Sequence, residues 1–309
     1  MRSQSKAYMY GASVVLIWST VATVFKLTLR FLSPAEMLMY SSLTSLVVFA
    51  ILLKNPLQLL KSVGKDIRRY ALFGFLNPFL YYNVLFLAYS ILPAQQAQPL
   101  NYTWQIFLFI FSVVFLGQRF TVRSLMAVLL GFLGVYVIST EGTFVEFSNI
   151  FGVVLALLSA VLWASFWILN LRDEKDIKEK LFLSYLFGSV YVFLEYLLLK
   201  PSLPSVEGIA GSIYIGIFEM GITYFFYLRA LKLSRTTTQV SVLIYLAPFL
   251  SFAFISIFVG ESIHPSSVIG ALLIVFGILV ETTQKSPETQ QCEKYGKSYN
   301  QSDHPHELR

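Results

Sequence analysis

The stretch Ser212-Ile213-Tyr214-Ile215-Gly216-Ile217-Phe218-Glu219-Met220-Gly221-Ile222-Thr223-Tyr224-Phe225-Phe226-Tyr227 carries a single acidic residue, Glu219, inside a long apolar run. A membrane-spanning helix needs about 20 predominantly apolar residues. A carboxylate at that depth costs about 3 kcal/mol or more, so it should face a polar partner or a wet cavity. At helical spacing, Glu219 shares one face with the small and polar residues Ser212, Gly216, Thr223 and Tyr227. The stretch therefore predicts a membrane helix with one polar face turned inward.

The composition of the whole chain is that of a membrane protein. Of its 309 residues, 56% are hydrophobic and 13% are charged, whereas soluble chains carry about 25% charged residues. The mean hydropathy is +0.66. The net charge of +6 lies in loops and the tail and forms no nucleic-acid patch. One cysteine and three histidines give no metal-binding spacing, so we expect no cofactor and no metal.

Apolar segments of about 20 residues recur along the chain, each able to cross roughly 30 Å of hydrocarbon. They cover residues 8–29, 34–53, 69–91, 95–116, 122–140, 150–170, 181–199, 209–231, 236–259 and 265–282. We therefore predict an all-α integral membrane protein with ten transmembrane helices. A cleaved signal peptide is the alternative for the first segment, but its apolar run continues to Leu29, so we expect a retained helix.

The basic residues alternate with the predicted helices. All 23 Lys and Arg residues except Lys26, Arg30 and Lys200 fall on one side of the predicted membrane. Cytoplasmic loops carry the excess of Lys and Arg, so we expect a multi-pass protein of the cell (cytoplasmic) membrane with both termini in the cytoplasm. The polar segment 283–309 is expected to be a disordered cytoplasmic tail.

The two halves of the chain resemble each other. Residues 116–120 match 259–263 in pattern, and further pairs recur in the same order: Gly74 with Gly216, Asn77 with Glu219, Tyr82 with Tyr224, Ala88 with Ala230, and Trp18 with Trp163. Residues 8–140 and 150–282 are thus predicted to be two five-helix repeats. Because five is odd, the repeats cross the membrane in opposite senses, which is the architecture of many secondary transporters.

A binding site is expected near the midplane, where equivalent positions of the two repeats approach each other. Glu219 would bind a substrate ammonium or a coupling proton, amide side chains would hydrogen-bond the substrate, and aromatic side chains would form the walls. The predicted substrate-binding residues are Glu219, Asn77, Tyr81, Trp18, Asn101, Gln105, Trp163, Tyr224 and Tyr245. The alternative is that the polar groups only join helices, through hydrogen bonds worth about 0.6 kcal/mol on average.

Proline and small residues give two further expectations. Pro78, Pro99 and Pro248 are predicted to kink their helices. Small residues suited to close helix contact lie in segments 122–140 and 265–282: Ala127, Gly131, Gly134, Gly270 and Gly277. We read these two helices as a scaffold or as the faces of a possible homodimer.

Several of these residues resemble a known family. The run Leu243-Ile244-Tyr245-Leu246-Ala247-Pro248, continued by Gly260-Glu261, Gly270 and Gly277, is similar to the repeat of EamA-type transporters of the drug/metabolite transporter superfamily, as is Trp18 through Lys26. Leu100-Asn101-Tyr102-Thr103-Trp104-Gln105 looks like the Asn-Tyr-Leu-Trp-Pro pattern of aromatic amino-acid exporters, with Gln105 in place of proline. The resemblance covers residues 8–282. It implies ten helices around a central cavity, lined mainly by helices 1, 3, 4, 6, 8 and 9.

We expect a secondary active transporter that exports amino acids or related small metabolites by alternating access, coupled to a proton or substrate gradient. A multidrug or other metabolite permease of the same fold is the alternative. A membrane-embedded enzyme would need a catalytic cluster at a membrane face, which the sequence does not offer. A sensor would need a sizeable soluble module, and the polar tail is too short and too biased in composition to form one.

Overall fold

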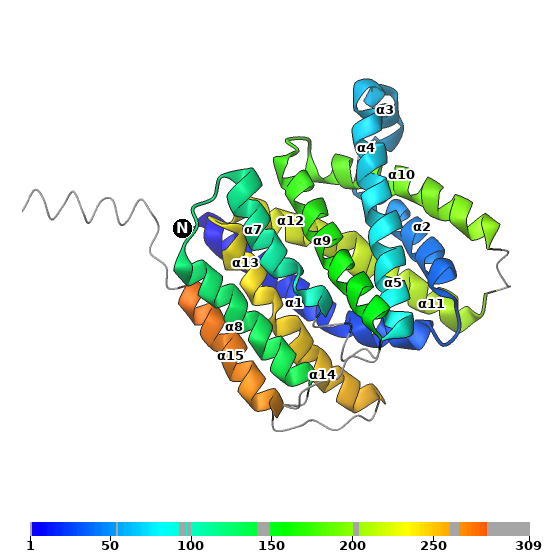
Figure 1. Ribbon diagram of the computed structural model, residues 1–309. Coiled ribbons are helices and arrows are strands. Elements are labelled where there is room, and N and C mark those ends of the chain that lie inside the picture. Colours follow the sequence, from blue (N-terminus) through cyan, green and yellow to red (C-terminus); the bar gives the residue numbers. More distant parts are fainter. Residues whose placement is uncertain are drawn as a thin grey trace, which may run out of the picture.

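The computed structural model describes residues 2–53, 55–92, 97, 100–140, 149–199, 204–259 and 266–282. Within these ranges the regular structure is entirely helical (Figure 1). The expected cytoplasmic tail, the predicted kink at Pro99 and residues 141–148, which connect the two predicted repeats, lie outside the described residues.

The helices follow the predicted apolar segments closely. The first half contains α1 (Arg2–Thr28), α2 (Pro34–Leu52), α3 (Pro56–Ser62), η1 (Gly64–Asp66), α4 (Ile67–Gly74), η2 (Phe75–Leu80), α5 (Tyr81–Ile91), α7 (Trp104–Leu116) and α8 (Val122–Ser139). The second half contains α9 (Ile150–Arg172), α10 (Ile177–Leu198), α11 (Val206–Tyr214), η3 (Ile215–Ile222), α12 (Thr223–Leu233), α13 (Thr237–Ile244), α14 (Leu246–Val259) and α15 (Ser266–Thr282).

Among the described residues, six helical runs are long and apolar enough to cross a membrane, and four shorter apolar helices accompany them. The six run Ser3–Thr28, Pro34–Leu52, Ile67–Ile91, Ile150–Arg172, Ile177–Leu198 and Val206–Leu233. The chain is thus a multi-pass membrane protein, and the count of ten spans stays a prediction. The short helix α3 was not predicted from the sequence, because it has only seven residues and follows the apolar segment directly.

Helix ends are fixed by ordinary capping chemistry. Ser33 caps α2 by accepting the backbone N–H of Glu36, whose side chain accepts the N–H of Ser33 in return, which makes a capping box. Asn149 and Ser205 cap α9 and α11 through their side-chain oxygens. Gly117 ends α7 with a φ of 65°, a left-handed conformation that glycine adopts without a Cβ penalty.

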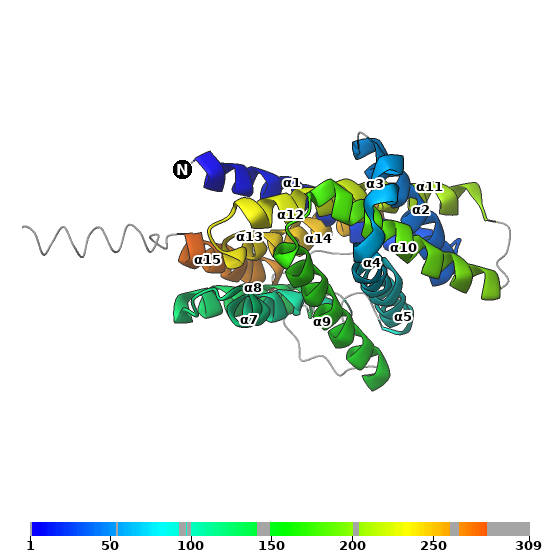
Figure 2. The same cartoon turned by 90° about the horizontal axis from the view of Figure 1, so that it is seen from above.

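The helices pack in a pattern that follows the sequence repeat. In the second half, α9 packs on α5 and α7 of the first half; correspondingly, α1 of the first half packs on α12 and α14 of the second. The helix α10 packs on α4 and η2, and its counterpart α2 packs on α11 and η3. The first helix of each half therefore packs on helices of the other half, and Figure 1 shows α9 lying between α7 and α5. Figure 2 shows the same bundle from above, with α1 along one side of it.

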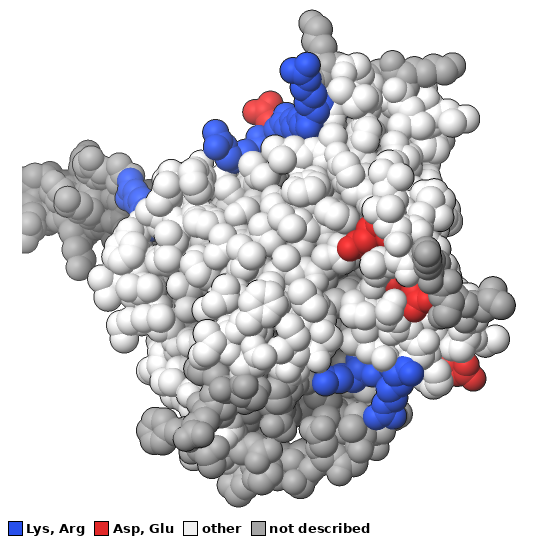
Figure 3. All heavy atoms as spheres, turned by 45° about the vertical axis from the view of Figure 1, so that its right-hand side comes forward, with Lys and Arg blue, Asp and Glu red and all other residues white. Residues whose placement is uncertain are grey.

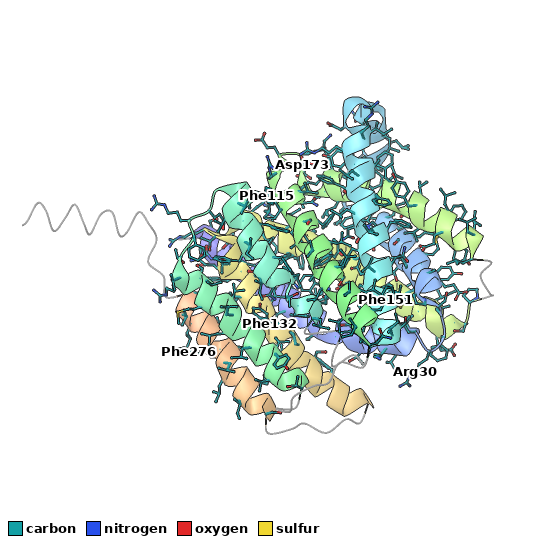
Figure 4. The ribbon with its side chains drawn as sticks, viewed as in Figure 1. Arg30, Phe115, Phe132, Phe151, Asp173 and Phe276 are labelled. Atoms are coloured by element: carbon teal, nitrogen blue, oxygen red, sulfur yellow. The ribbon has the colours of Figure 1, made fainter. Side chains whose placement is uncertain are left out.

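The outside of the bundle is apolar. Figure 4 shows Phe115, Phe151 and Phe276 on its outer surface, where they are 50%, 60% and 56% exposed. In the face shown in Figure 3, Lys and Arg side chains lie near the upper and lower edges, with largely uncharged surface between them. Such an apolar belt fits the hydrocarbon of a bilayer. The end that carries α3, the α9–α10 turn and most of the described basic residues is called the basic end below.

The small residues of α8 and α15 are used inside the molecule. A Cβ added at Gly134 would lie 2.5 Å from the carbonyl oxygen of Gly270, and one at Gly277 would lie 2.8 Å from that of Ala127. The two helices therefore touch each other backbone to backbone. This supports the scaffold interpretation, while a homodimer through their outer faces stays a prediction.

We expect Gly134→Ala to destabilise the protein by about 1–3 kcal/mol, because overpacking a tight contact forces backbone shifts. The added methyl group would lie 2.6 Å from Ile274 Cγ1 as well as against Gly270. Thermal unfolding of the purified protein in detergent measures the effect. Gly64→Ala is the matched control, since nothing lies within 4 Å of its Cβ position. Equal unfolding temperatures for the two variants would show that α8 and α15 are less closely packed than the contacts of Gly134 indicate.

Candidate functional site

The buried carboxylate of Glu219 stands at the end of a chain of hydroxyl groups. The Tyr82 hydroxyl donates to Glu219 Oε1 over 3.0 Å and lies 2.7 Å from the Tyr224 hydroxyl, and Asn77 Nδ2 donates to Tyr224 over 3.2 Å. Each hydroxyl has one proton, so donation by Tyr82 to Glu219 leaves Tyr224 to donate to Tyr82. Every proton of this chain then points toward the carboxylate. The arrangement stabilises a negative charge there.

The chain of hydroxyl groups joins equivalent positions of the two repeats. Tyr82 and Tyr224 correspond in the sequence repeat, as do Asn77 and Glu219, and all four are within one hydrogen-bonded chain. The rings of the equivalent Trp18 and Trp163 lie 6.2 Å apart. The two halves therefore meet at this point, as the repeat predicts.

The helices that carry Asn77 and Glu219 are both irregular at these two equivalent positions. The regions η2 and η3 are wide, π-helical turns that contain Asn77 and Glu219 respectively. Asn77 has extended backbone angles (φ −152°, ψ 122°) directly before Pro78, which confirms the predicted interruption there. Pro248 lies just after the break between α13 and α14. Wide turns often occur at functional sites in helices.

Glu219 borders a central cavity of about 60 Å³. The cavity is lined by side chains from α1, α5, α7 and α9, from residues 101 and 102, and from η3: Trp18, Val21, Phe25, Tyr81, Leu85, Tyr89, Asn101, Tyr102, Trp104, Trp163 and Glu219. Glu219 is only 6% exposed. The indole Nε1 of Trp18 interacts with the carboxyl group, and Oε2 has no other hydrogen-bond partner among the described residues. The carboxylate oxygen that Tyr82 does not hold therefore remains toward the cavity, beside Trp18.

The walls of the cavity are aromatic and in contact with one another. The indole rings of Trp18, Trp104 and Trp163 lie 6.2–6.5 Å apart in each pairing. Tyr81 stacks on Trp163 with ring centroids 4.3 Å apart. Asn101 Nδ2 donates to Ser159 Oγ over 2.9 Å, which ties the first half to α9. Aromatic walls with few polar groups are typical of small-molecule sites.

The structure places five of the predicted residues in the cavity wall: Trp18, Tyr81, Asn101, Trp163 and Glu219. Asn77 and Tyr224 lie behind the wall and reach Glu219 through hydrogen bonds.

Gln105 and Tyr245 are outside the described lining. Gln105 is fully buried and neither of its amide atoms has a partner among the described residues. The ring of Tyr245 instead lies over Gly131 of α8, where a Cβ would approach it to 2.2 Å, and near Tyr102.

Trp104, Tyr89 and Tyr102 line the cavity but are not among the predicted binding residues. Tyr82 was predicted only as a repeat position, without the bond from its hydroxyl to Glu219. The pairing of Tyr82 with Tyr224 in the repeat was the available signal, because equivalent positions meet at the centre.

A larger hollow, of about 520 Å³, lies at the basic end. It is lined by residues around the α2–α3 turn and the start of α10: Leu52, Leu53, Asn55, Gln58, Leu59, Asp176, Lys178 and Glu179. None of its lining residues belongs to the hydrogen-bonded chain of Asn77, Tyr224, Tyr82 and Glu219. The central cavity is therefore the candidate site, although it is smaller.

A second buried polar cluster lies at the basic end. Its centre is Asp173, which follows α9, is labelled in Figure 4 and is only 1% exposed. Asp173 accepts the Tyr70 hydroxyl over 2.8 Å, and Arg69 Nε lies 3.5 Å from the same carboxylate. The fully buried Lys180 donates to the backbone carbonyls of Asn170 and Asp173. Its position at the C-terminal end of α9 is electrostatically favourable for a cation. The cluster joins α4 of the first half to α9 and α10 of the second.

Comparison with known proteins finds a family match over nearly the whole chain. The model of the "EamA-like transporter family" matches residues 5–140 and again residues 150–283. The two matched regions fall on the two halves that pack against each other.

Individual relatives are described as transporters. A protein of Archaeoglobus fulgidus, named an uncharacterized transporter, is 25% identical over 288 residues, which cover 91% of this chain and 99% of the relative. The Bacillus subtilis uncharacterized transporter YvbV is 27% identical over 226 residues, covering 70% of this chain and 72% of the relative. A crystal structure with 22% identity superposes with a TM-score of 0.75, covering 90% of this chain and 98% of that one. That likeness shows the fold.

Proposed function

This chain belongs to the EamA-like transporter family, and from that premise we propose that it is a secondary transporter that exports amino acids or related small metabolites by alternating access. The observation that carries the proposal is the position of the buried Glu219 carboxylate at the wall of the central cavity. One of its carboxylate oxygens is held by Tyr82, and the other is left toward an aromatic cavity where the two halves meet. A charge at this depth is expensive unless a partner balances it. A substrate ammonium group or a coupling proton supplies that partner.

The packing of the two halves supports alternating access. Because each half packs its first helix on the other half, a rocking motion can exchange which end of the cavity is open. The Asp173 cluster joins α4 to α9 and α10 at the basic end, and the cavity lies between Glu219, Phe25 of α1 and Tyr89 of α5. We place the basic end in the cytoplasm, following the bias of Lys and Arg. The described cavity then extends toward the outer face.

Transport by purified protein in proteoliposomes tests the proposal. Liposomes that contain the protein and are loaded with an unlabelled amino acid or related metabolite should take up the same compound in labelled form by exchange. The amount taken up should be well above that in protein-free liposomes. Imposing a pH difference across the membrane then separates proton coupling from simple exchange. Exchange confined to large hydrophobic drugs would favour a multidrug permease. No exchange with any member of the panel would contradict the proposal.

The hydroxyl chain gives a sharper prediction. We expect Tyr82→Phe and Tyr224→Phe each to lower the exchange rate about tenfold or more, since a hydrogen bond to a charged group is worth about 1.5–3 kcal/mol. Only Tyr82 touches the carboxylate, but Tyr224 holds Tyr82 in its donating orientation. The double variant should be hardly worse than either single one, because both interrupt the same chain. Tyr40→Phe is the control, since the Tyr40 hydroxyl bonds that of Tyr196 and does not belong to this chain. Additive losses would show that the two hydroxyl groups act separately.

A further inference from the structure

The side chains around Glu219 show which kind of ligand can share the cavity with it. None of the described lining residues is Lys, Arg or His. The described ion pairs, between Arg69 and Asp173 and between Lys175 and Asp66, lie at the basic end. A negative charge on Glu219 therefore has no positive side chain of the described protein beside it. The balancing charge has to come from what enters the cavity.

The rest of the wall suits a cation. Trp18, Trp104 and Trp163 all line the cavity, and Tyr81 stacks on Trp163. The face of an aromatic ring carries partial negative charge and attracts ammonium groups, most strongly for Trp. Such an attraction is worth about 2 kcal/mol or more when the cation is desolvated. Carboxylate and indole rings together are the chemistry that recognises an organic ammonium ion.

The same wall is unfavourable for a carboxylate on the ligand. A zwitterionic amino acid would bring a second negative charge into a cavity that already contains Glu219. Asn101 Nδ2 donates one of its two hydrogens to Ser159 Oγ, and an amide group carries no positive charge to balance a second carboxylate. Like charges that share a desolvated site repel each other strongly, because the local dielectric constant is low. An amine without a carboxylate avoids this cost.

The size of the cavity also favours a small amine as the ligand. About 60 Å³ accommodates an ammonium head group and a few attached carbons, and is well below the roughly 300 Å³ or more of drug-sized sites. The wall beyond the indoles, formed by Phe25, Leu85 and Tyr89, is apolar or aromatic and suits a short hydrocarbon body.

We propose that, among the small metabolites assigned to this transporter above, the site selects small organic amines that lack a carboxylate over the amino acids related to them. The inference rests on the proposed transport function for its biological meaning. It rests on Glu219, the three indoles and the absence of a basic lining residue among the described ones for its chemistry.

Matched ligand pairs test the proposal on the purified full-length protein. Isobutylamine and valine differ by one carboxylate, as do ethylamine and alanine, and isobutanol and ethanol are the neutral analogues of the two amines. Binding is followed by quenching of tryptophan fluorescence, since three of the four tryptophans line the cavity, and by thermal stabilisation. We expect each amine to bind at least tenfold more tightly than its amino acid and its alcohol.

Two variants test whether the amines bind at Glu219. Glu219→Gln should reduce amine affinity at least tenfold, whereas Glu195→Gln should leave it unchanged, because Glu195 lies outside the described lining and bonds Asn83. Amino acids that bind as tightly as the amines, amines that do not bind, or an unchanged affinity in Glu219→Gln would each overturn the proposal. The ligand pairs decide it on the unmodified protein even if Glu219→Gln does not fold.

The two proposals fail separately. Amines that bind in detergent but do not exchange across proteoliposomes would contradict transport and leave the binding selectivity standing. Exchange of amino acids at rates equal to those of their amines would retain the transport function and remove the selectivity.

Discussion

Replacing Glu219 with glutamine should lower substrate exchange in proteoliposomes about tenfold to a hundredfold and remove any dependence on a pH difference. Glutamine keeps the shape of the side chain and can still accept the Tyr82 hydroxyl through its amide oxygen. It cannot carry the charge that pairs with an ammonium group, nor bind and release a proton. A charge-assisted hydrogen bond is worth about 1.5–3 kcal/mol, which sets the size of the loss.

Two controls make this result interpretable. The thermal stability of Glu219→Gln should stay close to that of the unmodified protein, because the amide preserves the bond from Tyr82. Glu195→Gln changes another membrane-helix carboxylate, one that accepts Asn83 Nδ2 over 2.7 Å, and should transport normally. If Glu219→Gln exchanges substrate at the normal rate with normal pH dependence, Glu219 only joins helices.

Replacing Asp173 with alanine should destabilise the protein by about 3 kcal/mol or more. Both carboxylate oxygens are used: Oδ1 accepts the backbone N–H of Lys175 over 2.9 Å, and Oδ2 accepts the Tyr70 hydroxyl over 2.8 Å. Lys180 donates to the backbone carbonyl of Asp173, a contact that alanine keeps. Removing the carboxylate takes away two hydrogen bonds to a charged group, each worth about 1.5–3 kcal/mol, and leaves the buried Tyr70 hydroxyl without its acceptor.

Asp66→Ala is the matched control at the same end of the molecule. The Asp66 side chain is 43% exposed and pairs with Lys175 over 3.3 Å, and pairs at such exposed positions contribute about 1 kcal/mol or less. Thermal unfolding in detergent compares the two variants. A loss for Asp173→Ala no larger than that for Asp66→Ala would show that the cluster does not hold α4 against α9 and α10.

Much of the fold was predictable because the bilayer imposes simple rules on sequence. Apolar runs matched α1, α2, α9 and α10 to within a few residues at most ends. The equivalence of Asn77 with Glu219 in the sequence repeat predicted where the two halves meet, since repeats related by a pseudo-two-fold axis bring equivalent positions together.

The candidate site was only partly predictable, and the helix irregularities explain why. A face predicted from a period of 3.6 residues assumes an unbroken helix, but η2 and η3 each contain a wider turn. Residues after such a turn are rotated relative to the prediction. Tyr82 therefore reaches Glu219, which uninterrupted periodicity did not indicate. The position of Tyr245 depended on Gly131, a contact between helices far apart in sequence.

By itself the sequence determined that this chain spans membranes, that its halves repeat and that one acidic group lies deep inside. Those properties follow from hydrocarbon thickness and from the cost of burying charge, which act on each segment separately. Only the tertiary structure decided which oxygen of Glu219 is held by Tyr82, which indoles line the cavity beside it and that Asp173 joins α9 to α4 at the basic end. These depend on how helices rotate and cross, which is set by side-chain packing between segments distant in the sequence.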